Sequence, residues 1–77
     1  MYVFPMECYP DPDSDPSVVM IVVAASENDA VDLAFDHPNA AQYAAVKVSP
    51  KGYKKKKVSG LERGIHGFVN WKVFEAL

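Results

Sequence analysis

The residue types suited to chemistry or binding fall into two groups of opposite charge along the chain. Residues 1–46 contain eight acidic side chains and no Lys or Arg, whereas residues 47–77 contain eight basic side chains and two acids. The two parts therefore carry −8 and +6, which sum to the formal net charge of −2. Such an asymmetry indicates an electrostatic partner, or two parts that neutralise each other within the fold.

Six aspartates are candidates for an acidic partner-binding surface. Three lie among the prolines of residues 10–16, and three recur at helical spacing in residues 29–36. The aspartates of the first group alternate like calcium ligands, but the Gly and the distal Glu of a calcium loop are missing, so a solvated loop is expected there. The predicted acidic surface comprises Asp11, Asp13, Asp15, Asp29, Asp32 and Asp36.

The alternative site is a dense basic run in residues 51–57. Its ammonium groups could neutralise several phosphates, and its tyrosine could stack on a base. Lysines on an exposed edge strand also discourage aggregation, which is the simpler interpretation. This basic patch comprises Lys51, Tyr53, Lys54, Lys55, Lys56, Lys57 and, further along, Arg63.

The sequence offers no catalytic or cofactor motif. No nucleophile elbow, P-loop or dinucleotide-binding glycine pattern is present. Cys8 follows Glu7 and has no basic neighbour, so a buried structural thiol is expected. His37 is expected to cap a helix and His66 to lie in a polar loop, and they do not have metal-ligand spacing. We therefore expect a non-enzymatic protein without a cofactor or a metal site.

The expected fold is a single small α+β domain over residues 1–77. Residues 2–9 read as a strand that Pro5 places at a sheet edge or at a bulge. The uninterrupted apolar run 18–25 is typical of a central strand. A helix then begins at Ser26, whose hydroxyl can accept from the N–H of Asp29, and ends at His37 before one further turn.

The second half predicts three more strands. Residues 43–49 and 53–58 form a hairpin about a turn at 50–52, and residues 60–67 form a glycine-rich loop. Residues 68–74 form the last strand, after which residues 75–77 could continue as a helix. The order is β-β-α-β-β-β, a mainly antiparallel sheet of about five strands with one helix on one face. The strand–helix–strand step from residue 18 to residue 48 allows one parallel pair.

The apolar strand that runs into residues 24–34, AASENDAVDLA, resembles the strand-to-helix unit of small phage and prophage proteins, among them anti-CRISPR inhibitors. The resemblance implies a compact protein that blocks a host machine by occupying its surface, in the host cytoplasm. We expect the acidic surface to meet a basic nucleic-acid channel on a host protein or nucleoprotein complex.

Two other functions remain open from the sequence alone. One is direct binding of nucleic acid through the basic patch, and the other is a structural homodimer that pairs through edge strands. A membrane role is not expected, because the apolar run 18–25 is too short to cross a bilayer and the N-terminus lacks the basic start of a signal peptide.

Overall fold

The structure is a computed structural model that describes residues 1–50, 56–57 and 59–76. It confirms a small α+β fold with an antiparallel sheet. The elements in chain order are β1 (Tyr2–Tyr9), β2 (Val18–Ala24), α1 (Glu27–Asp36), the 3-10 helix η1 (Pro38–Gln42), β3 (Ala45–Val48), β4 (Lys56–Lys57), β5 (Gly64–Asn70) and α2 (Trp71–Ala76).

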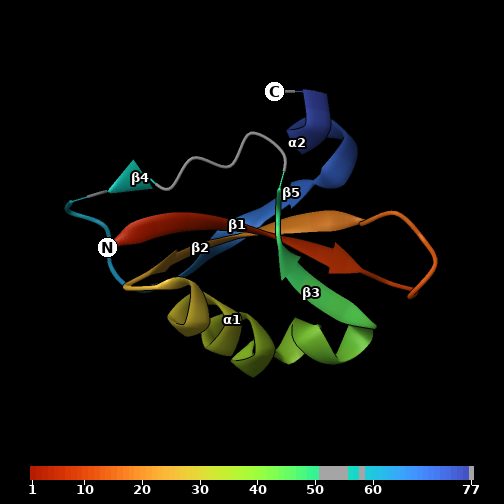
Figure 1. The fold of residues 1–77 in the computed structure, drawn as a ribbon, viewed down its shortest axis with the longest axis horizontal. Coiled ribbons are helices and arrows are strands. Elements are labelled where there is room, and N and C mark those ends of the chain that lie inside the picture. Colours follow the sequence, from red (N-terminus) through yellow and green to blue (C-terminus); the bar gives the residue numbers. More distant parts are fainter. Residues whose placement is uncertain (51–55, 58, 77) are drawn as a thin grey trace.

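The sheet has the strand order β3-β1-β2-β5, and each of these pairs is antiparallel (Figure 1). The two-residue β4 pairs with the first residues of β1, on the same edge that β3 occupies further along. Within the described residues the sheet is therefore four strands wide. The expectation of about five strands holds only in part, because β4 adds no further width.

The parallel pair and the hairpin are both wrong. β2 and β3 do run in the same direction, but β1 lies between them, so they do not pair. β4 pairs with β1 and not with β3, because both segments lie along one edge of β1 in the same direction. The predicted turn at 50–52 lies mostly outside the described residues.

Pro5 does not place β1 at an edge or at a bulge, so that prediction is wrong. β1 is central and pairs with β2 in continuous register from Tyr2 to Cys8. On the other side, the Ser49 N–H donates to the Pro5 carbonyl at 2.8 Å. The reciprocal bond would need the N–H that proline lacks. β3 ends at Val48, so the sheet accommodates Pro5 by ending the neighbouring strand.

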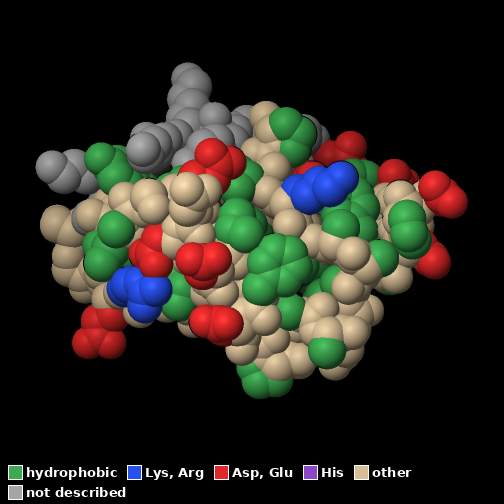
Figure 2. Space-filling model, turned by 60° about the horizontal axis from the view of Figure 1, so that its bottom comes forward, with side chains coloured by type: hydrophobic (Ala, Val, Ile, Leu, Met, Phe, Trp, Pro, Cys, Tyr) green, Lys and Arg blue, Asp and Glu red, His purple; other side chains and the backbone are tan. Residues whose placement is uncertain are grey.

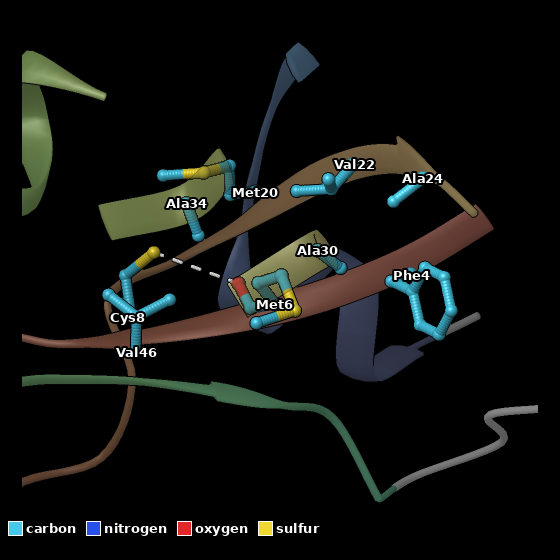
Figure 3. Close-up of a cluster of buried hydrophobic side chains, with 9 residues drawn as sticks. All are labelled: Phe4, Met6, Cys8, Met20, Val22, Ala24, Ala30, Ala34 and Val46. Carbon is cyan, nitrogen blue, oxygen red and sulfur yellow. Dashed lines mark hydrogen bonds between the residues drawn. The ribbon is translucent and has the colours of Figure 1, made fainter. Parts of the chain in front are cut away.

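β2 is central, as its composition predicts, and it is covered on both faces. Successive side chains of a strand point to opposite faces, and both sets are buried in β2, which explains its uninterrupted apolar sequence. The set facing α1 joins residues from three other elements in the main core (Figure 3): Phe4, Met6, Cys8, Met20, Val22, Ala24, Ala30, Ala34 and Val46.

Helix α1 begins as predicted. The Ser26 hydroxyl accepts from the N–H of Asp29 at 3.1 Å, and the Asp29 carboxylate accepts from the N–H of Ala25 at 3.1 Å. In a capping box the third helical side chain accepts from the N–H of the N-cap residue; here Asp29 accepts from the residue before the N-cap. Ala30 and Ala34 pack against the sheet, and their small side chains let the helix approach it closely.

The C-terminal part differs from the prediction. The loop predicted for residues 60–67 is wrong in its second half, since β5 begins at Gly64. The pairing of β5 with β2 contains a register shift between Ile21 and Val22. The predicted strand 68–74 ends at Asn70, whose side chain accepts from the N–H of Lys72 at 2.9 Å. Asn is a favoured helix N-cap. The following residues form α2, which lies on the side of the sheet opposite α1 (Figure 1).

Candidate functional site

The six predicted acidic residues do not form one surface. Asp11, Asp13 and Asp15 lie in the loop between β1 and β2, whereas the other three lie on α1. Figure 2, which brings the α1 side forward, shows acidic side chains gathered in two places with hydrophobic side chains between them. The structure therefore divides the acidic surface into a loop group and a helix group.

Asp29 is held by Arg63, the residue that precedes β5. The Arg63 Nε lies 3.1 and 2.9 Å from the two carboxylate oxygens of Asp29, and its Nη2 donates to Oδ1 as well. This bidentate bond, followed by the bond from the Ala25 N–H, lowers the pKa of Asp29 to about 2. The two oppositely charged parts of the chain thus neutralise each other at this pair, and Asp29 has a structural role.

Helix α1 lies along β5 and contacts it near both ends. Arg63 and Asp29 join the start of β5 to the first turn of the helix. The rings of His37 and Phe68 meet edge to face at the other end, with centroids 5.2 Å apart. The acidic side of α1 consequently faces the β5 side of the molecule.

Asp32 and Asp36 occupy this same side of α1. Together with Asp29, they raise the pKa of Arg63. No ion pair holds either of them within the described residues, and both are exposed. Like Glu27 in the first turn, they are carboxylates of α1 that remain available to a partner.

The edge of the sheet beside these carboxylates is formed by β5. No residue of β5 is buried, in contrast to β2, and the Phe68 side chain is 39% exposed. The Trp71 N–H donates to the Ser17 carbonyl at 3.1 Å, toward β2. Because the direction of backbone groups alternates along an antiparallel strand, the groups of Phe68 and Asn70 point away from the sheet.

This open edge was missed from the sequence because residues 60–67 contain three glycines. Gly64 and Gly67 have φ angles of 147° and 153°, which other residues rarely adopt, and they lie at the start of β5 and beside its bulge. A glycine inside a strand pattern often marks a bulge. That signal was present in the sequence.

The predicted basic patch lies largely outside the described residues. This applies to Lys51, Tyr53, Lys54 and Lys55. Lys56 and Lys57 form β4 beside β1. Arg63 makes hydrogen bonds to Asp29 and also interacts with the charges of Asp32 and Asp36, so its surroundings are acidic.

A buried carboxylate that the sequence analysis did not single out lies on the α2 side of the sheet. Glu7 is 6% exposed, and its oxygens accept from the Tyr9 hydroxyl (2.9 Å), the Ser49 hydroxyl (3.2 Å) and the Trp71 indole N–H (3.3 Å). These bonds join β1, the end of β3 and α2. A buried polar group with several partners fixes the arrangement of the elements that supply them.

Cys8, His37 and His66 each have contacts or burial that indicate a structural role. Cys8 is fully buried, and its burial raises the thiol pKa to about 11, so it is unsuited to nucleophilic chemistry. The His37 Nδ1 accepts from the N–H of Asn39 at 3.1 Å, so its side chain caps the start of η1, directly after the end of α1. His66 contacts the Glu62 carbonyl at 2.6 Å and lies in β5, not in a loop.

Two further kinds of feature are absent from the described residues. No group of His, Cys, Asp and Glu there has a metal-binding arrangement. Neither α1 nor α2 has the length and apolar character that a bilayer-crossing helix requires, nor does any other described helix.

Comparison of the chain with protein-family models, with curated proteins and with solved structures gave no significant match.

Proposed function

We propose that this chain is a non-enzymatic protein-binding module that presents the acidic side of α1 to a basic surface of a protein partner. The observation that carries the proposal is the placement of Asp32 and Asp36. They lie on one side of α1, exposed and without an ion pair among the described residues, next to the open edge of β5.

The arrangement favours a partner over internal neutralisation at these two positions. The hydrogen bonds of Arg63 go to Asp29, and its charge acts on Asp32 and Asp36 only through space, so neither of these two carboxylates has an ion-pair partner among the described residues. Exposed acidic groups of this kind steer association with a basic partner and make it depend on salt. A basic nucleic-acid channel of a host protein or nucleoprotein complex is the partner that we propose, and occupying that channel would inhibit it.

The loop group of acids provides a matched control. Asp11 and Asp13 are exposed like Asp32 and Asp36. They lie in the loop that precedes β2, however, whereas the first turn of α1 follows β2 at the other end of the strand. Asp29 is unsuitable for a test, because its replacement would also remove a cap contact and the ion pair with Arg63.

The test is capture of a partner from host extract by the immobilised chain, followed by measurement of affinity for the purified partner with and without double-stranded DNA. Asp32→Lys combined with Asp36→Lys should weaken binding by more than tenfold, whereas Asp11→Lys combined with Asp13→Lys should leave it nearly unchanged. DNA should compete with the chain for the partner.

Equal loss in the two double variants would show a general effect of net charge and refute a specific α1 surface. Direct binding of the purified chain to DNA without any partner, abolished when residues Lys54–Lys57 are replaced by alanine, would instead support the basic patch as the site.

A further inference from the structure

The outer edge of β5 carries backbone groups that no described residue uses. β5 ends the strand order β3-β1-β2-β5. The N–H and C=O groups of Phe68 and the N–H of Asn70 point away from β2, whereas the Asn70 carbonyl accepts the first hydrogen bond of α2. Such a row of groups is a template for pairing with another strand.

β5 lacks most of the features that keep sheet edges from pairing. Natural proteins protect edges with lysines, prolines, inward-pointing charges and bulges. The seven residues of β5, GIHGFVN, include no Lys, Arg, Asp, Glu or Pro. The bulge lies in the first half of the strand, between the partners of Ile21 and Val22, so the second half runs regularly from Gly67 to Asn70.

The charge beside this edge indicates which kind of strand fits. On the α1 side, Asp32 and Asp36 flank β5, and the exposed ring of Phe68 lies on the same face. An added strand would lie about 4.8 Å beyond β5, with every second side chain on that face. Lysine or arginine fits there, because its apolar stem can cover Phe68 while its charged end reaches a carboxylate.

We propose that the β5 edge binds an extended segment of the partner as an added strand, with Lys or Arg at alternate positions. This inference rests on the proposed function and names the part of the partner that the acidic side of α1 contacts. Main-chain hydrogen bonds to Phe68 and Asn70 supply affinity, and the alternating cations supply specificity.

A second copy of this chain fits the same edge less well. Antiparallel pairing of two β5 strands about a two-fold axis would put both α1 helices on one face of the joined sheet. Their acidic sides would then face each other across the seam, and like charges opposed in this way are unfavourable.

The experiment uses the full chain and a synthetic peptide of about eight residues in which lysine alternates with valine or threonine. The control peptide has the same composition, with its lysines contiguous. Binding is followed by amide hydrogen exchange measured by NMR. We expect the alternating peptide to slow exchange at Phe68 and Asn70 and the control peptide to slow it much less.

The carboxylates are tested in the same assay. Asp32→Asn with Asp36→Asn should weaken binding of the alternating peptide by roughly threefold to tenfold at low salt, whereas Asp11→Asn with Asp13→Asn should not. Peptide binding without slower exchange at Phe68 and Asn70 would overturn strand addition and leave the proposed function intact. Loss of partner capture by the Asp32 and Asp36 variants is the separate criterion for that function.

Self-association is the remaining outcome. Slower exchange at both amides without peptide, increasing with protein concentration and accompanied by twice the 8.5 kDa mass, would overturn the proposal in favour of a second copy.

Discussion

Truncation of Glu7 to alanine should remove about 3 kcal/mol from the free energy of unfolding. The Ser49 hydroxyl is fully buried and would lose its carboxylate acceptor, which costs about 1–3 kcal/mol. The Trp71 N–H would lose a longer bond of 3.3 Å, worth about 1 kcal/mol. The Tyr9 hydroxyl is only part-buried and can turn to water, so it adds little.

A loss of this size is large for the chain. A domain of 77 residues is expected to have a free energy of unfolding of about 4–12 kcal/mol. The melting temperature of the Glu7→Ala variant should fall by roughly 12–24 °C. Glu7→Gln should cost only about 1 kcal/mol, because its carbonyl can still accept from Ser49 and Trp71 while its NH2 donates to the Tyr9 oxygen.

Urea unfolding followed by fluorescence and by far-UV circular dichroism provides the assay. Trp71 is the one tryptophan of the chain, so its fluorescence reports on the contact between α2 and the sheet. Glu7→Ala combined with Ser49→Ala should be less destabilising than the sum of the single changes by about 1–2 kcal/mol. Additive losses, or a loss below about 1 kcal/mol in Glu7→Ala, would refute the account of the Glu7 network.

Three further predictions follow from single contacts. The pKa of Asp29 is lowered to about 2, so its ion pair with Arg63 should stabilise the fold above about pH 4 and lose this effect as the pH falls toward 2. The urea midpoint should therefore depend less on pH in Arg63→Ala than in the original chain, and an equal pH dependence in the two proteins would contradict the pairing. The buried Cys8, with its thiol pKa raised to about 11, should resist a thiol reagent at about pH 8 until urea unfolds the chain. Fast labelling of the folded protein would contradict this prediction. His37→Ala should lower the free energy of unfolding by about 1 kcal/mol through loss of the cap on Asn39, whereas His37→Asn retains a capping acceptor. Equal melting temperatures of these two variants would exclude loss of the cap as the cause of the destabilisation.

The sequence was sufficient for the elements whose signals are local. The apolar run of β2 and the Ser26–Asp29 pair gave a central strand and the start of a helix, and both are confirmed. Pro5 was misinterpreted because the rule for proline in strands considers one strand at a time. The missing N–H lies opposite Ser49, 44 residues later in the chain, where β3 has just ended.

The candidate site was harder to predict because it depends on which strands are neighbours. Charge counting grouped six aspartates, but only the fold separates the loop acids from those of α1 and assigns Asp29 to Arg63. β5 lies at the edge of the sheet because β1 lies between β2 and β3, and no residue of β5 encodes that strand order. Asn70 did carry a local signal, a helix cap, that was missed because the polar residues of the segment 68–74 scatter around a helical wheel and so favoured a strand.

The order of strands has a consequence for synthesis on the ribosome. β1 and β2, the two central strands, are the first to emerge, and they pair with each other through a short loop. β2 nevertheless keeps an unpaired apolar edge until residues 64–70 are made, since β5 is the strand that covers it. A nascent or truncated chain that ends before Gly64 therefore exposes the most apolar strand of the protein to its neighbours, and aggregation is expected to compete with folding until the last fifth of the chain is complete.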